Sequence, residues 1–288
     1  MPARRLPLIG LGLALAMLVA ACSTRAPTVT APPGGSVKVM VSIVPQKYFV
    51  ERIGGDKVNV SVMVAPGFNP ATYEPRPSQI QALSETQMYV RVGVPFEEAW
   101  MGRIEAANEH MLIVDQSQGI ERIEGTDPHI WLSPRLAKVQ ARTIFDGLVE
   151  LDPNNESFYR PNLDAFLADL DELDASIEQT LANLESRKFM VFHPAWSYFA
   201  RDYDLEMIPV QIEGSDPSAA EMADLIRRAR ENNIKVIFAQ PEFSTERAAT
   251  IAQEMGGEVL LISPLAPDWL DNLRQVADTF ALVLADQK

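Results

Sequence analysis

The sequence predicts an α/β protein of two lobes, each with a parallel sheet and flanking helices, joined by one long rigid helix. Short apolar runs alternate with segments of helical composition on both sides of the chain's middle, an order typical of parallel sheets with crossover helices. Between these halves, the apolar residues of Pro161 to Ser186 recur at helical spacing. A helix of this length spans about 39 Å, which is enough to connect two lobes.

The N-terminus has the pattern of an export signal. Residues 1–21 contain Arg4 and Arg5, then an apolar run, then small residues, as in a signal peptide. The residues that end at Cys22 resemble the lipobox of bacterial lipoproteins, which predicts a lipidated Cys22 and a membrane anchor. Residues 22–36, rich in Pro, Thr, Gly and Ser, are expected to form a flexible tether. The alternative is an ordinary secretory signal that ends by chance at a Cys.

The charge and the cysteine content limit the possible functions. The 288 residues carry a net charge of -14, and residues 1–21 hold two Arg and no acid, so the remaining chain stands at -16. Such an excess of acid argues against a nucleic-acid-binding surface and fits an extracytoplasmic protein that handles cations or small ligands. Cys22 is the only cysteine, so no internal disulfide can form.

The N-terminal lobe is expected at residues 37–152. Alternating or continuous apolar runs predict its strands, and each is followed by a helical pattern. Residues 65–77 hold one Gly and four Pro, which exclude regular structure there. We expect strands at 37–44, 58–64, 88–94 and 111–114, and helices at 45–53, 78–86, 95–108 and 135–151.

The linking helix falls within residues 153–186, with Pro161 in its first turn, and the C-terminal lobe is expected at 187–288. Ser218 and Glu221 have the spacing of a capping box, which marks one helix start. We expect strands at 188–192, 206–212, 234–239 and 258–262, and helices at 195–203, 218–231 and 244–255.

Two histidines are candidate ligands. His129 follows Asp127 and Pro128, and Asp127 is placed to orient its ring. His193 ends a predicted strand, at the sheet edge where parallel sheets bind ligands. The same edge should carry Glu213, Glu242 and Ser263, although the sequence favours a solvated loop carboxylate for Glu213 and is equally consistent with one for Glu242. For either His the alternative is a structural polar residue, and His110 has the setting of a solvated one.

A set of motifs in this order resembles a known family. The motifs NPATYEPRPSQ, DPHIWLSP, FHPAWSYFA, IFAQPEFS and ISPLAPDWL are similar to those of the ZnuA/TroA solute-binding lipoproteins of zinc and manganese ABC importers. The resemblance covers the chain from about Val37. It implies two α/β lobes, a rigid linking helix, a metal ion in the cleft between the lobes and an ABC permease as partner.

Carried over to this chain, the resemblance gives His129 and His193 as metal ligands, one from each lobe. Two family ligand positions are altered, because Ala71 stands where the family commonly has His and Ser263 where it has Asp. Glu242 is the substitute ligand we expect in the C-terminal lobe, and Glu74 could compensate from the N-terminal lobe. Two imidazoles favour Zn²⁺ over Mn²⁺, which prefers harder oxygen ligands.

These residues predict a monomeric, periplasmic, membrane-anchored lipoprotein that delivers zinc to an importer from a modified site. One alternative is a zinc-dependent hydrolase-like enzyme, with Glu213 or Glu242 as base; the absence of HExxH and GxSxG motifs argues against it. Another is a lipoprotein that has lost transport and serves adhesion or structure.

Overall fold

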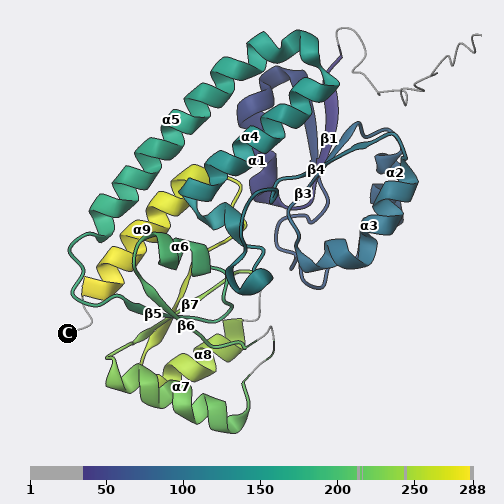
Figure 1. Ribbon diagram of the computed structural model, residues 1–288. Helices are drawn as coiled ribbons and strands as arrows, with labels where there is room; N and C mark the ends of the chain where they lie inside the picture. Colours follow the sequence, from purple (N-terminus) through teal and green to yellow (C-terminus); the bar gives the residue numbers. More distant parts are fainter. Residues whose placement is uncertain (1–34, 213–214, 216, 243–244, 286–288) are drawn as a thin grey trace, which may run out of the picture.

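The computed structural model describes residues 35–212, 215, 217–242 and 245–285. It contains two sheets of four parallel strands, with helices on their faces, as the sequence predicted (Figure 1). The predicted signal peptide, Cys22 and nearly all of the predicted tether lie outside the described residues, as does Glu213. No helix in the described part of the chain is both long and apolar enough to cross a membrane.

The N-terminal sheet has the strand order β2-β1-β3-β4, and all its pairings are parallel. The predicted order of elements is confirmed, with ends that shift by a few residues. The strands are β1 (Val37–Val41), β2 (Val58–Val62), β3 (Met88–Arg91) and β4 (Leu112–Asp115), and the helices are α1 (Val44–Gly54), α2 (Pro77–Leu83), α3 (Pro95–Ala107) and α4 (Pro134–Leu151).

The C-terminal sheet repeats this arrangement with the order β6-β5-β7-β8. The predicted capping box is present, because the Ser218 hydroxyl accepts from the Glu221 amide while the Glu221 carboxylate accepts from the Ser218 amide. The strands are β5 (Lys188–Val191), β6 (Glu206–Pro209), β7 (Val236–Ala239) and β8 (Glu258–Leu261), and the helices are α6 (Ser197–Asp202), α7 (Ala219–Glu231), α8 (Thr245–Met255) and α9 (Trp269–Ala285).

The linking helix α5 runs from Glu156 to Leu181, so it begins and ends about five residues earlier than the pattern indicated. It begins early because a short turn at Pro153–Asn155 leads directly into it. Pro161 is therefore inside the helix and not in its first turn, which corrects our expectation. The helix ends where the Arg187 guanidinium donates hydrogen bonds to the carbonyl oxygens of Leu181 and Ala182.

Buried apolar side chains form one continuous cluster through both lobes. Helix α9, which the sequence analysis did not assign, packs against α5 and completes this cluster. Its Trp269 ring meets the Phe49 ring of α1 with centroids 4.9 Å apart, and its Phe280 ring lies 4.6 Å from Phe189 of β5. A second, smaller cluster lies under α7 and α8. The lobes therefore share a core.

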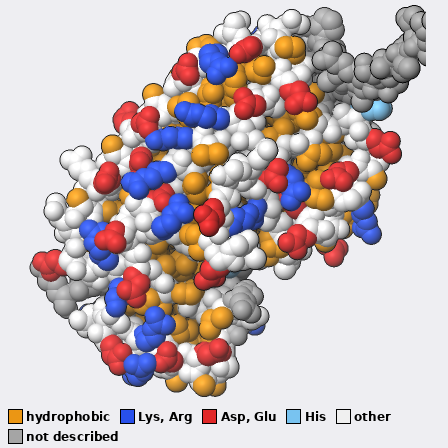
Figure 2. Space-filling model, in the orientation of Figure 1, with side chains coloured by type: hydrophobic (Ala, Val, Ile, Leu, Met, Phe, Trp, Pro, Cys, Tyr) orange, Lys and Arg blue, Asp and Glu red, His pale blue; other side chains and the backbone are white. Residues whose placement is uncertain are grey.

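Polar contacts also fasten α5 to both lobes. Asp174 accepts a hydrogen bond of 3.0 Å from the Arg135 guanidinium of α4 and one of 2.9 Å from the Tyr203 hydroxyl, which follows α6. Asp169 pairs with Arg52 of α1. On the face shown in Figure 2, acidic and basic side chains are interspersed over the surface. Exposed pairs of this kind each contribute about 0–1 kcal/mol to stability. Apolar packing therefore contributes most of the free energy that holds α5 to the two lobes.

Candidate metal centre

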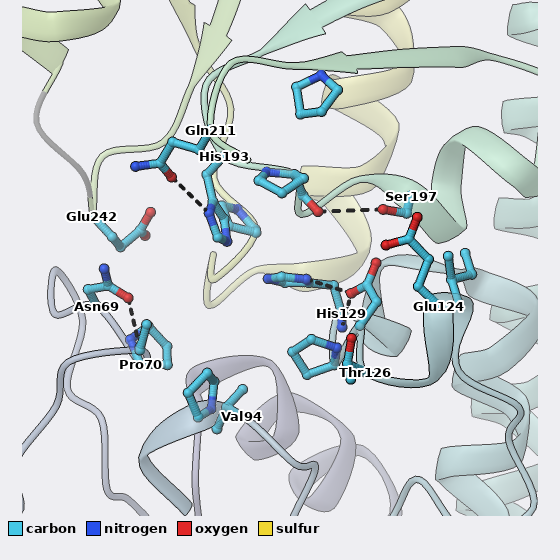
Figure 3. A pocket seen from close by; sticks show the side chains of 18 of the residues that line it. Asn69, Pro70, Val94, Glu124, Thr126, His129, His193, Ser197, Gln211 and Glu242 are labelled. Carbon is cyan, nitrogen blue, oxygen red and sulfur yellow. Dashed lines mark hydrogen bonds and ion pairs between the residues drawn. The ribbon is translucent and has the colours of Figure 1, made fainter. Parts of the chain in front are cut away.

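A cavity of about 920 Å³ lies between the two lobes. Both predicted histidines line it, together with segments that follow the strands of each sheet (Figure 3). Its wall includes six prolines, whose rings fix the backbone around it. These are Pro70, Pro95, Pro128, Pro194, Pro209 and Pro264.

His129 lies in the loop before α4, where Asp127 holds it as predicted. One Asp127 carboxylate oxygen is 2.7 Å from His129 Nδ1 and accepts the His129 amide at 2.9 Å. Burial acts to raise the pKa of Asp127, but the hydrogen bonds and the charge of His129 outweigh it and lower that pKa. Tyr198 from the other lobe donates to the Asp127 carbonyl oxygen at 2.8 Å, so this loop is positioned by both lobes.

His193 lies two residues after the end of β5, at the carboxyl edge of the C-terminal sheet. Its Nδ1 lies 3.2 Å from Oε1 of Gln211, and Gln240 donates from Nε2 to the His193 carbonyl oxygen at 3.0 Å. Burial first, and the charge of His129 second, lower the pKa of His193 from 6.5 to about 4. The imidazole is therefore neutral at neutral pH, which is the form that binds metal ions.

The structure brings the two predicted histidines together. Their ring centroids are 5.3 Å apart, with the rings inclined at 72°, although they lie on different lobes. Asp127 and Gln211 each present an acceptor to an Nδ1 atom, which favours the tautomer with the proton on Nδ1. In that tautomer Nε2 is the coordinating nitrogen of both rings.

Glu242 also lines the cavity, and its two carboxylate oxygens differ in their surroundings. Oε1 accepts from the Ser263 hydroxyl at 3.2 Å, while Oε2 is buried and has no hydrogen-bond partner among the residues that the structure describes. Burial raises the pKa of Glu242 by more than the hydrogen bonds from its own backbone amide and from the Ser263 hydroxyl lower it. An unpaired buried carboxylate oxygen is costly, so Oε2 is suited to a cation or to a donor on a ligand.

The other predicted positions are placed differently. Ala71 lines the cavity from the N-terminal lobe, but its methyl group offers no donor. Ser263 is not among the lining residues, and its hydroxyl donates a hydrogen bond to Glu242. Glu74 is exposed and lies outside the cavity lining, and His110 is exposed, as predicted.

Two polar residues of the site were not singled out from the sequence. Gln211 holds His193, and Asn69 lines the cavity while its Oδ1 accepts the Ala71 amide at 2.8 Å. The position of Gln211, just after β6 on the sheet edge that carries His193, was a usable signal. Asn69 stands in the Pro-rich loop, where no periodicity marks a side chain.

The described side chains supply two imidazoles at close range, with Glu242 further along the same cavity. Among residues 35–285, apart from the few not described, no three His, Cys, Asp or Glu side chains converge closely enough to hold one ion. Two imidazole nitrogens can form half of the tetrahedral set that Zn²⁺ prefers. Completion of that set requires a further donor.

The fold and the cavity define a class of protein: a two-lobed solute-binding protein with a nitrogen-donor site between its lobes. The family model for ZnuA, the periplasmic component A of a zinc-uptake complex, matches residues 39–282. The chain belongs to this family, whose members are the solute-binding proteins of metal ABC importers.

Curated relatives and solved structures agree with this assignment. The chain is 30% identical over 272 residues to the high-affinity zinc uptake system protein ZnuA of Bacillus subtilis, covering 86% of this chain and 85% of that protein. It is 26% identical over 287 residues to the manganese-binding lipoprotein MntA of Halalkalibacterium halodurans, covering 92% and 94%. A zinc-bound crystal structure of a ZnuA deletion mutant matches with a TM-score of 0.84 and 48% identity, over 88% of this chain and all of that one.

Proposed function

We propose that the protein binds zinc between its lobes, outside the cytoplasm, and delivers the ion to an ABC importer. The observation that carries the proposal is the approach of His129 and His193 from opposite lobes, with ring centroids 5.3 Å apart and each Nδ1 beside an acceptor. Oriented neutral imidazoles are good zinc ligands. The zinc-uptake relatives named above support the choice of zinc.

Zinc fits this donor set better than manganese does. Mn²⁺ prefers carboxylate, carbonyl and water oxygens, whereas the two side chains that meet here present nitrogen. Glu242, the third donor expected from the sequence, does not converge with the two histidines on one ion among the described residues. We propose instead that its buried Oε2 atom, which has no partner among those residues, contacts the bound cargo, while the Ser263 hydroxyl holds the other oxygen. Ala71 and Ser263 are then the altered positions of a modified site.

The test is the metal content of protein purified without added zinc, followed by titration against a chelator of known affinity. The wild-type protein should retain zinc, and His129→Ala and His193→Ala should each lose most of that affinity. His110→Ala is the matched control, because His110 is exposed and outside the cavity. Equal zinc binding by all four proteins would overturn the assignment of the two ligands.

We further propose that Cys22 carries a lipid that anchors the protein to a membrane, with residues 22–36 as a tether. The small residues before Cys22 and the Pro- and Thr-rich stretch after it support this. Cys22→Ser should release soluble protein or leave an uncleaved precursor. Unchanged membrane partition and an unchanged mass of the mature protein would reject the anchor.

A further inference from the structure

The cavity is much larger than a bare ion requires. Zinc ligands lie about 2.0–2.3 Å from the ion, so four protein ligands would enclose only a small volume. The cavity measures about 920 Å³, which is near the upper end of the roughly 300–1,000 Å³ typical of sites for organic ligands. Six prolines in its wall restrict the backbone motion that could close it around an ion.

The described residues of the site also supply few metal donors. His129 and His193 leave about two of four tetrahedral positions to be filled. Ala71 presents a methyl group where it lines the cavity, and the Ser263 hydroxyl is turned to Glu242. A bidentate molecule that carries its own nitrogen and oxygen donors would complete the set.

One buried atom in the cavity wall requires a hydrogen-bond donor. Glu242 Oε2 is buried and has no partner in the described part of the chain, and such an atom costs about 1–3 kcal/mol unless something donates to it. The metal-bound amine of a chelating amino acid keeps two N–H groups, either of which can donate there. A carboxylate-only chelator has no such group and would place its charge beside Glu242.

We propose that this site takes zinc as a complex with a free α-amino acid, whose amine and carboxylate complete the coordination begun by His129 and His193. The amine also donates to Glu242, and the amino-acid side chain occupies part of the remaining cavity volume. The amine proton of the free amino acid passes to solvent when the chelate forms. This inference rests on the proposed zinc-binding function and specifies the form of its cargo.

The test uses zinc alone, zinc with L-histidine and zinc with malonate, at matched free zinc concentrations. Native mass spectrometry should show a complex of one protein, one zinc and one histidine. Histidine should tighten zinc retention by about tenfold or more, whereas malonate, which has only carboxylate groups, should only compete for the ion.

Three other results would overturn the inference, a part of it, or both proposals. If the protein holds zinc alone and histidine merely strips it, the proposed function stands and this inference is overturned. If malonate tightens retention as much as histidine does, recognition of the amine by Glu242 is overturned. If the protein holds no zinc in any arm, both proposals fail.

Two variants test the residues independently. Glu242→Gln should weaken the histidine complex by about tenfold, while Glu178→Gln, on the exposed side of α5, should match the wild type. Ala71→His supplies a donor from the protein, so it should bind zinc with little further gain from histidine. If histidine tightens zinc retention in both Glu242→Gln and Ala71→His as much as it does in the wild type, the assigned contacts are overturned.

Discussion

Protonation of His193 is opposed by its surroundings, and this has a consequence for stability. Burial first, and the charge of His129 second, lower its pKa from 6.5 to about 4. As the pH falls through this window, the unfolded chain takes up a proton that the folded protein does not. The free energy of unfolding of the metal-free protein should therefore fall by up to about 3 kcal/mol as the pH falls from 6.5 to about 4, and His193 should contribute no pH dependence above pH 6.5.

Urea denaturation across this pH window measures the effect. His193→Gln removes the titrating ring and should lose this part of the pH dependence. His110→Gln replaces an exposed ring and should keep the wild-type profile. A wild-type protein whose unfolding free energy is no lower at the acid end than at neutral pH would contradict the prediction.

A third imidazole at position 71 should strengthen zinc binding. Ala71 lines the cavity from the N-terminal lobe, so Ala71→His replaces a solvent ligand of the ion by a tethered one. We expect zinc affinity to rise by about tenfold or more, which is about 1.4 kcal/mol or more. Competition titration measures this, and Ala175→His, on the exposed surface of α5, is the control. An unchanged affinity would mean that position 71 does not reach the ion.

At the scale of elements, two tryptophans join the lobes by hydrogen bonds of their indole groups. Trp131 donates to the Pro264 carbonyl oxygen at 2.8 Å, and Trp269 donates to the Trp131 carbonyl oxygen at 2.9 Å. Both side chains are buried. The two bonds tie the turn before α4 to the segment that leads into α9.

Trp269→Phe should destabilise the protein by more than the smaller buried apolar area of the phenyl ring alone would. The change leaves the Trp131 carbonyl oxygen buried without a donor, which costs about 1–3 kcal/mol. Chemical denaturation should show this loss. Trp100→Phe, at a partly exposed position on α3, should change stability much less, and equal effects of the two substitutions would exclude a special role for the Trp269 bond.

The strands and most helices could be predicted because the residues that a strand or helix buries are apolar and recur at a regular spacing in the sequence. Val37–Val41 is buried on nearly every residue, and Ser218 carries its cap signal locally. Helix α9 is not among the predicted helices, although its buried residues have helical spacing. The start of α5 depended on a three-residue turn, for which no periodic signal exists.

The site was predictable where the chemistry lies in the residue type itself. The predicted ligands His129 and His193 meet in the cavity, and Asp127 contacts the His129 ring as expected; their binding of a metal ion stays a prediction. The turn of Ser263 toward Glu242 was not foreseen, because it depends on how the loops after β7 and β8 pack together. Contacts between two loops leave no pattern in either loop's sequence.

For the whole molecule, the shared core limits how far the lobes can move. The apolar cluster runs from β1 through α5 to α9 without a break at the lobe boundary, and Asp174 bonds to both lobes. Large relative motions are expected between domains unless their interface is extensive and apolar. This interface is apolar and includes buried indole hydrogen bonds.

Ligand binding should therefore change the overall shape only slightly. A hinge closure would have to separate Trp269 from Phe49 and break the Trp131 carbonyl bond, exposing buried aromatic surface at about 25 cal/mol per Å². Small-angle scattering with and without zinc, and with zinc plus histidine, should give the same radius of gyration within error. Trp269→Ala, which removes the contact with Phe49 and the indole bond together, should widen the distribution of lobe separations. A wild-type radius that shrinks measurably on binding would show that the ligand supplies enough free energy to rearrange this core, and that α5 is not a rigid connection.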